Sequence, residues 1–187
     1  ACAPYRRLHL CHHNLESIQT KNYNSSNAKH DLLAEVCLAA KYEGDSITRY
    51  HPQHKETNPD SQICTVLARS FADIGDIVRG KDLFLGHNKR KIQLEESLKK
   101  MFQNIQVKNA KLQNLSLHQV REYWWALNRQ QVWNAITCSA EENDRYSKTV
   151  DDGKTTLWNE KCGRELSSVP TNLDYVPQHL RWFEEWA

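Results

Sequence analysis

A compact run of basic residues, Lys89-Arg90-Lys91, is the feature of this sequence with the clearest capacity for binding chemistry. Residues 81–111 carry eight Lys and Arg against three acids, although the whole chain has a net charge of only +2. A patch of flexible cations attracts sulfate or phosphate without needing a deep pocket. In an arbitrary protein, however, such a pattern more often denotes a solvated helix face. The segment is therefore a candidate polyanion-binding surface.

The basic residues follow one expected helix, over 91–107, and extend beyond both of its ends. On a helix that begins near residue 90, Lys91 and Lys99 are about two turns apart, so we expect them to share a side. Lys100 lies within reach of that face, and Lys108 extends the row. The cations predicted to bind are Lys89, Arg90, Lys91, Lys99, Lys100, Lys108 and Lys111.

Two other clusters have residue types that occur in catalytic or metal sites. Asp73 and Asp76 stand one turn apart, as an acid pair would. With Arg69 and Arg79 close in sequence, salt bridges or helix caps are the expected role. The run Cys11-His12-His13 resembles a metal-ligand set, but adjacent ligands on a short loop rarely close a tetrahedron, so we expect solvated histidines. Nucleophile elbows, phosphate-binding glycine loops and HExxH motifs are absent. We predict no catalysis, no cofactor and no bound transition metal.

The cysteines indicate where the protein works. An even number of dispersed cysteines, with no CxxC pair among them, is typical of an oxidising, extracellular setting. That setting makes nucleic acid an unfavoured partner, although phosphate would suit the basic segment as well as sulfate. Six cysteines allow fifteen connectivities, and spacing alone does not choose among them. They are Cys2, Cys11, Cys37, Cys64, Cys138 and Cys162.

Hydrophobic periodicity predicts an all-α fold. The helices are expected at 28–43, 63–79, 91–107 and 117–136, with a last one whose first turn contains Pro177. Gly44 and Gly80 stand where C-terminal caps belong. Long surface loops are expected at 45–62 and 139–172, because these stretches are polar, and residues 1–27 also have a loop-like composition. No segment alternates as a strand of useful length would.

The helix at 117–136 contains three tryptophans in the run "REYWWALNRQQVW". At about 100° per residue, Trp124 and Trp133 point nearly opposite ways and Trp125 lies between them. A ligand platform would place the rings on one side, so we predict that Trp124 and Trp133 are buried core residues. Ser116 and Gln119 form a plausible capping box at the start of this helix.

Two further expectations concern packing. Gly75 lies inside the apolar stripe of its helix, which suggests that a neighbouring helix approaches closely there. The last helix is expected to turn four apolar residues toward the core: Val176, Leu180, Phe183 and Trp186.

Five long blocks resemble the alpha-class Duffy-binding-like domains that open the variant erythrocyte membrane proteins of malaria parasites. The blocks, in order, are "ACAPYRRLHLC", "LLAEVCLAAKYEG", "ICTVLARSFADIGDIVRGKDLFLG", "REYWWALNRQQVWNAITC" and "VPTNLDYVPQHLRWFEEWA". The resemblance covers the whole chain. It implies a disulfide-linked helical bundle of subdomains one and two only, divided as 1–60 and 61–187. The segments 45–60, 86–116 and 139–169 resemble the family's variable segments.

The resemblance also implies disulfide pairings. In similar domains, the cysteine before the "LARSFADIGDI" helix pairs with one in the loop before the "PQHLRWF" helix, which corresponds to Cys64 and Cys162. Cys37 and Cys138 then remain, inside or at the end of core helices, as an expected second pair. Cys2 and Cys11 resemble cysteines whose usual partners lie upstream, so they are either free or joined to each other.

The resemblance implies an extracellular adhesin, displayed on the infected red cell and varied under antibody pressure. Alpha-class members are associated with rosetting, the capture of uninfected red cells through sulfated glycosaminoglycans such as heparan sulfate, blood-group sugars or complement receptor. In that context the basic segment becomes a predicted site for sulfated glycans. The alternative is a structural or antigenic-decoy module that draws host antibodies while receptor contacts lie elsewhere in the parent protein.

A second basic cluster, Arg6, Arg7 and His9, lies inside the first family block. We expect its two arginines to pair with carboxylates and to have a structural role. The longest apolar runs are only a few residues, so we expect no membrane contact by this chain, and any membrane anchor of the parent protein is expected outside it.

Overall fold

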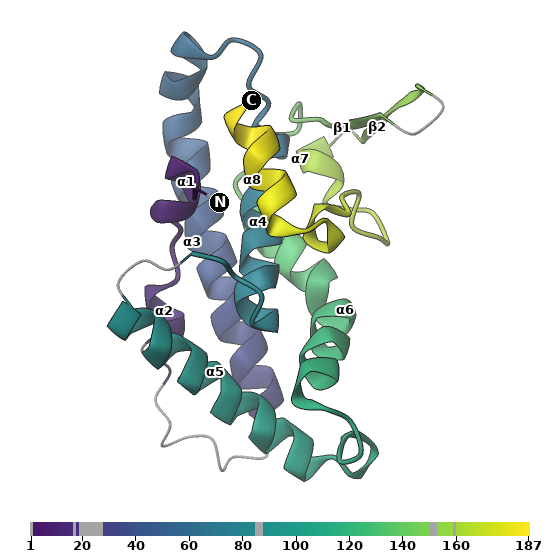
Figure 1. The fold of residues 1–187 in the computed structure, drawn as a ribbon. Helices are drawn as coiled ribbons and strands as arrows, with labels where there is room; N and C mark the ends of the chain where they lie inside the picture. Colours follow the sequence, from purple (N-terminus) through teal and green to yellow (C-terminus); the bar gives the residue numbers. More distant parts are fainter. Residues whose placement is uncertain (1, 17, 19–27, 85–87, 150–152, 159) are drawn as a thin grey trace.

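The computed structural model describes residues 2–16, 18, 28–84, 88–149, 153–158 and 160–187 and is mostly helical, as predicted (Figure 1). Its longer helices are α3 (Ala28–Thr57), α4 (Ile63–Arg79), α5 (Asn88–Lys108), α6 (Leu117–Ile136) and α8 (Gln178–Trp186). The short helices are α1 (Tyr5–Leu8), α2 (His13–Glu16) and α7 (Glu160–Gly163), with 3₁₀ turns at Ala110–Leu112 (η2) and Leu173–Tyr175 (η3). Among the described residues, no helix combines the length and apolar character needed to span a bilayer.

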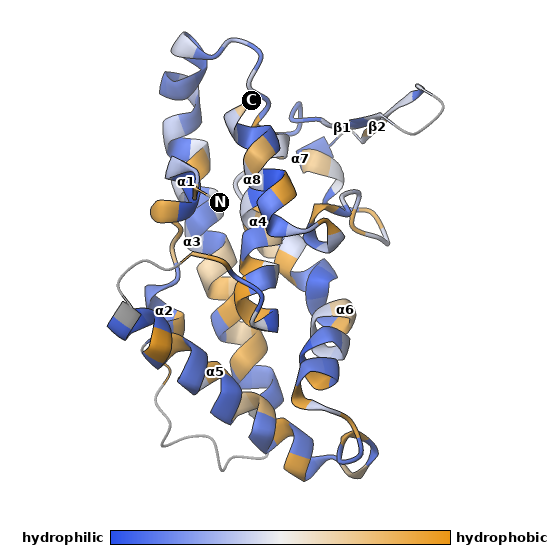
Figure 2. Ribbon diagram, viewed as in Figure 1, coloured by the Kyte–Doolittle hydropathy of each residue, from blue (hydrophilic) through white to orange (hydrophobic). Residues whose placement is uncertain are grey.

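The core lies where α3, α4 and α6 pack together, and α5 closes one side of it. Figure 2 shows hydrophobic residues gathered where these helices approach one another, and a more hydrophilic far end of α3. α4 is buried along nearly its whole length, because it also contacts η3 and α8. It ends at Gly80, whose φ of 75° provides the left-handed cap that the sequence predicts.

The tryptophans of α6 are core residues, which confirms the prediction. Trp124 is 4% exposed and packs edge-to-face on Phe102 of α5, with ring centroids 5.8 Å apart. Trp133 is fully buried and makes the same kind of contact with Phe71 of α4 at 5.3 Å. Ser116 caps the helix as expected, accepting a hydrogen bond from the backbone N–H of Gln119. The rings therefore join three helices and are not a ligand platform.

α4 and α6 pack closely at Gly75, which confirms the expected tight packing. A Cβ at this position would lie 2.7 Å from the Cζ2 atom of Trp125. Trp125 is itself fully buried, and its indole N–H donates to Asp174 at 2.8 Å, so the ring is held in place.

We expect Gly75→Ala to destabilise the protein by about 1–3 kcal/mol, because the added methyl group overpacks the interface. The sign of the change is the test. If the site had room, alanine would stabilise the helix by about 1 kcal/mol, because alanine is the better helix former. Urea unfolding followed by circular dichroism measures the difference, and a more stable variant would contradict the close packing.

α3 is longer than predicted, because the helix does not end at Gly44. It continues through Pro52 to Thr57, so much of the expected loop at 45–62 is helical. Gly44 serves close packing: a Cβ there would overlap the backbone carbonyl of Ile136 in α6. An ion pair of 2.6 Å between Lys41 and Asp45, one turn apart, supports the helix across this point.

The expected loop at 139–172 contains an antiparallel hairpin, which corrects the prediction that no strand would form. Strand β1 (Tyr146–Thr149) pairs with β2 (Thr155–Trp158). Tyr146 anchors the hairpin, because its buried ring packs against Trp133 of α6 and Trp158 of the partner strand. The ring centroids are 6.1 and 5.9 Å apart, respectively. In the expected loop at 1–27 the structure has α1 and α2, and the part of that prediction beyond Ile18 lies outside the described residues.

α8 turns a different face inward from the one predicted. Leu180, Phe183 and Trp186 are all more than half exposed. The residues buried are instead Gln178, Arg181 and Trp182. The reason is that these side chains reach the buried carboxylates of α4, described below, so polar partners decide the orientation of the helix.

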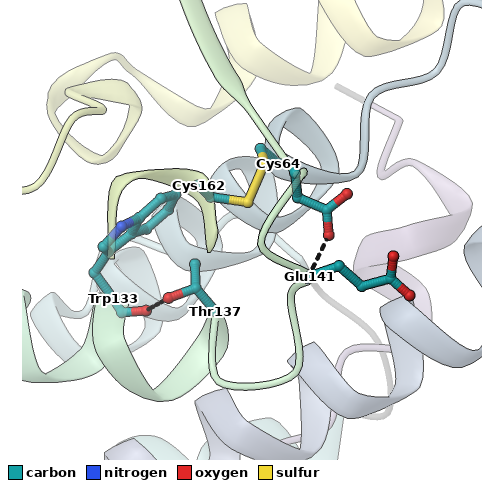
Figure 3. Close-up of a disulfide and its surroundings, with 6 residues drawn as sticks. Cys64, Trp133, Thr137, Glu141 and Cys162 are labelled. Atoms are coloured by element: carbon teal, nitrogen blue, oxygen red, sulfur yellow. Dashed lines mark hydrogen bonds between the residues drawn. A yellow bond between two sulfur atoms is a disulfide. The ribbon is translucent and has the colours of Figure 1, made fainter. Parts of the chain in front are cut away.

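The disulfide between Cys64 and Cys162 is present and confirms the first expected pairing. Figure 3 shows it with Trp133 of α6 and with Thr137, the residue after that helix, in its surroundings. Both cysteines are fully buried, so the crosslink fixes the loop before α8 to the start of α4 within the core.

The second expected pairing, Cys37 with Cys138, is wrong. Both are free thiols, because Cys37 packs against the core from within α3 whereas Cys138 lies beyond the end of α6 and is exposed. Burial raises the pKa of the Cys37 thiol to about 11. Cys2 and Cys11 are also free, which is one of the two alternatives that the sequence left open.

Candidate glycan-binding surface

α5 presents cations to solvent because its apolar residues recur at helical spacing. Its buried stripe consists of Leu94, Leu98, Met101, Phe102 and Ile105, which pack into the core. A helix with one apolar stripe leaves the opposite side to water. Six of the seven predicted cations are exposed: Lys89, Arg90, Lys99, Lys100, Lys108 and, in η2, Lys111.

Lys91 differs from the other six and breaks the expected row. It is half-buried, and its Nζ donates to the backbone carbonyl of Asp82 at 3.0 Å. Lys91 precedes the buried Leu94 by one turn, which places it beside the apolar stripe. Eight residues at about 100° each leave about 80° between Lys91 and Lys99, so the two do not share a side. Neutralising Lys91 would therefore disturb a structural contact.

Two of the three acids in residues 81–111 are held by arginines from other parts of the chain. Asp82 forms an ion pair with Arg7 of α1. Glu95 forms one with Arg121 of α6, whose guanidinium is nearly buried. Glu96, which is also exposed, lies one turn before Lys99 and Lys100. The surface of α5 is therefore more positive than the sequence count suggests.

The acid pair Asp73 and Asp76 belongs to a buried ionic network. Asp73 is fully buried and accepts hydrogen bonds from Arg6 and Arg181, both at 2.7 Å. Burial alone would raise the pKa of Asp73, but the two arginines outweigh it and lower that pKa. For Asp76 burial prevails over Arg181 and raises the pKa to about 6. The expected salt bridges exist, although Arg181 and Arg6 stand where Arg69 was expected.

Both arginines of the second basic cluster, Arg6 and Arg7, pair with carboxylates, as expected. Arg6 also forms an ion pair of 2.8 Å with Glu185 of α8, which joins the two ends of the described chain. The run Cys11-His12-His13 has no metal-site geometry: within the described residues, no group of three or more His, Cys, Asp or Glu could hold an ion. Burial and the nearby Glu43 raise the pKa of the Cys11 thiol to about 11, which disfavours the thiolate that metals bind.

The comparisons with known proteins place this fold in one family. The model of the Duffy binding domain matches residues 1–181. The chain belongs to the Duffy binding domain family. A crystal structure of the NTS-DBL1α-1 domain of membrane protein 1 (PfEMP1) from the Plasmodium falciparum varO strain is similar, with 43% identity and a TM-score of 0.87. That similarity covers 100% of this chain and 43% of the other.

Two other members of the family are more distant. A PfEMP1 DBLβ domain, solved bound to human ICAM-1, has 30% identity and a TM-score of 0.70, over 97% of this chain and 38% of that chain. The "Duffy receptor gamma form" of Plasmodium knowlesi is 23% identical over 199 residues, which are 100% of this chain and 15% of the receptor. The present Duffy binding domain thus spans less than half of each relative. Domains of this family are adhesion modules and not enzymes, and the similarity to the NTS-DBL1α-1 structure agrees with the alpha class.

The sequence of this Duffy binding domain does not show which distant residues hold the acids on and beside α5. Arg121 is a residue of the tryptophan-rich run, and nothing local indicates that it pairs with Glu95 or donates to the carbonyl of Val78 at 2.7 Å. Gln178, likewise, donates to Asp82 at 2.8 Å from a distant helix. The available signal was that two family blocks hold more arginines than acids: "ACAPYRRLHLC" has two arginines and no acid, and "REYWWALNRQQVWNAITC" has two arginines and one acid.

Proposed function

We propose that this Duffy binding domain is an extracellular adhesion domain of a variant surface antigen on infected red cells, and that it binds sulfated glycans through α5. The observation that carries the proposal is the row of exposed cations on α5, whose neighbouring acids Asp82 and Glu95 are held by arginines. From Lys89 to Lys108 the helix rises about 28 Å, enough for several sulfates of one chain to bind at once. Weak single contacts then combine through multivalency.

The host receptor is part of the proposal. The related DBLβ domain was solved bound to human ICAM-1, so a relative binds a host cell-surface protein. For this domain, the charge of α5 favours heparan sulfate over blood-group sugars or complement receptor, because neutral sugars gain little from a row of cations. Rosetting and exposure to host antibodies at the infected-cell surface follow from that role.

We also propose that residues 1–60 and 61–187 are subdomains of one folding unit. The division falls between α3 and α4. Leu32 and Val36 of α3 belong to the same buried cluster as Phe71 of α4 and Trp133 of α6. Because the two segments share one core, neither buries its apolar surface alone.

Neutralising four exposed cations of α5 (Lys89→Gln, Arg90→Gln, Lys99→Gln, Lys100→Gln) is expected to lower heparin affinity. Losing four exposed ion pairs of about 0.3–0.5 kcal/mol each should raise the dissociation constant for heparin roughly tenfold or more. The variant should elute from immobilised heparin at a lower salt concentration than the wild type. It leaves out Lys91, whose contact with Asp82 is structural. Wild-type binding should itself weaken steeply with salt, because screening shortens the range of these interactions.

A control with the same change in net charge separates a site from a general charge effect. It neutralises four cations that are exposed away from α5: Lys29, Arg49, Lys55 and Arg145. This control should elute close to the wild type. Equal effects of the two variants would mean that heparin responds to net charge only. An unchanged elution of the α5 variant would contradict the proposal and favour a structural or decoy module.

A further inference from the structure

A cavity of about 500 Å³ lies between the first turn of α5 and the segment that contains α1 and α2. α2 contacts α5, and Figure 1 shows the beginning of α5 beside it. The cavity lies at one end of the cationic row, so it adjoins the surface proposed to bind glycan. Its basic lining residues are Arg7, His9, His12, His13, Arg90 and Lys91.

Arg7 provides a buried donor at this cavity. The residue is only 2% exposed, and its Nε and Nη2 donate to the carboxylate of Asp82 at 3.1 and 2.5 Å. Its guanidinium lies over the ring of Phe84, 4.8 Å from the centroid. Nη1 is buried and has no hydrogen-bond partner among the described residues. A buried cationic N–H without an acceptor is unfavourable, and an anion in the cavity would supply one.

The charges around the cavity favour an anion. Arg7, Arg90 and Lys91 contribute three positive charges against two negative charges from Glu16 and Asp82, before any charge on histidine. Both acids are already engaged. Asp82 accepts from Arg7 and from Gln178, and Glu16 lies 3.0 Å from the Nδ1 of His12.

Arg90 is an exposed counterpart to the buried Arg7. It is exposed and has no ion-pair partner among the residues that the structure describes. It lies in the first turn of α5, a helix long enough for its dipole to add partial positive charge at this end. Lys91, whose Nζ uses one of its three donors on Asp82, retains two for a ligand.

We propose that this cavity holds one sulfate group of the bound glycan, between the Nη1 of Arg7 and the side chains of Arg90 and Lys91. The inference rests on the proposed function and adds a fixed position to it. The sulfate fills part of the volume, and the apolar side chains of Leu8 and Phe84 suit the sugar ring that carries it. The exposed cations along α5 then attract the glycan, and the cavity fixes the position of one of its sulfates along the helix.

The test compares two exposed cations on the same helix. Calorimetry with a heparin tetrasaccharide should show that Arg90→Ala weakens binding by about fivefold or more, because a charge-assisted contact is lost. Lys99→Ala removes the same charge outside the cavity and should change affinity by less than about twofold. Leu8→Trp changes no charge but narrows the cavity beside Arg7, and it should weaken binding as Arg90→Ala does. The fully desulfated tetrasaccharide should not bind.

A second readout follows Arg7 without changing it. In the ¹⁵N-labelled wild type, the tetrasaccharide should shift the guanidinium resonance of Arg7 saturably. Sodium sulfate at constant ionic strength tests whether a free anion does the same, and a shift with sulfate but none with the tetrasaccharide would overturn the proposal for a glycan. If Arg90→Ala and Lys99→Ala lowered tetrasaccharide affinity equally and Leu8→Trp left it unchanged, the cavity would not be a sulfate site. The proposed function would still stand. No tetrasaccharide binding by the wild type would overturn both.

Discussion

Replacing Trp133 by alanine is expected to lower the free energy of unfolding by about 3–5 kcal/mol, a large part of the total stability of a domain this size. The ring is fully buried between Phe71 of α4 and Tyr146 of the hairpin, with centroids at 5.3 and 6.1 Å. Removing it leaves a cavity that two different elements would have to close. Urea unfolding monitored by circular dichroism measures the loss, and Trp124→Ala should behave in the same way.

Two substitutions make this test specific. Trp133→Phe keeps an aromatic ring and removes an indole N–H that has no partner among the described residues, so its cost should be much smaller. Tyr123→Ala removes a ring that is 55% exposed on the same helix and should change stability by less than about 0.5 kcal/mol. A Trp133→Ala protein with wild-type stability and lost ligand binding would show that the core assignment is wrong.

Removing the disulfide is the second change with a large expected effect. The double variant Cys64→Ala, Cys162→Ala should lose about 4–5 kcal/mol on the chain-entropy account, because the crosslink closes a loop of 98 residues in the unfolded chain. Denaturant unfolding with and without reductant measures it: the wild type should be destabilised by reductant and the double variant should not.

The free cysteines supply the control. Cys37→Ala, Cys138→Ala removes two thiols that are not joined, so its stability should fall by much less and its response to reductant should match the wild type. Peptide mapping of the unreduced protein tests the assignment itself. Recovery of Cys64 linked to any cysteine other than Cys162, or in alkylated form, would be incompatible with this pairing.

The helices that the sequence predicts best are those whose ends have local signals. α4 ends at Gly80 and α6 begins at the Ser116 capping box, and both were predicted within the bounds observed. Gly44 was misassigned because glycine serves both as a helix terminator and as a point of close packing. The apolar stripe of α3 continues through it to Ile47, which packs against the core, so a longer helix was recoverable from the pattern.

The parts that could not be predicted depend on partners far away in sequence. Hydrophobicity alone turns Phe183 inward, but Arg181 is buried because Asp73 and Asp76, more than a hundred residues earlier, compensate its charge. The hairpin has only four residues in each strand, too few for alternation to be visible, and it is anchored by Tyr146 on α6.

The candidate site shows the same limit. Composition identified α5 as cationic, and six of the seven predicted cations are exposed. Its periodicity did not reveal that Lys91 contacts the carbonyl of Asp82, nor that Arg7 and Arg121 hold the acids beside it. One side of the cavity next to Arg90 is formed by the segment with α1 and α2, which the sequence suggested was a loop.

The most direct test of adhesion through sulfated glycans is binding of the fluorescently labelled domain to host red cells before and after treatment with heparan sulfate lyase. We predict that wild-type binding is largely lost after the lyase, and that the α5 variant binds weakly before and after. Undiminished binding to lyase-treated cells would contradict the proposed function and would assign recognition to a protein receptor or a neutral sugar.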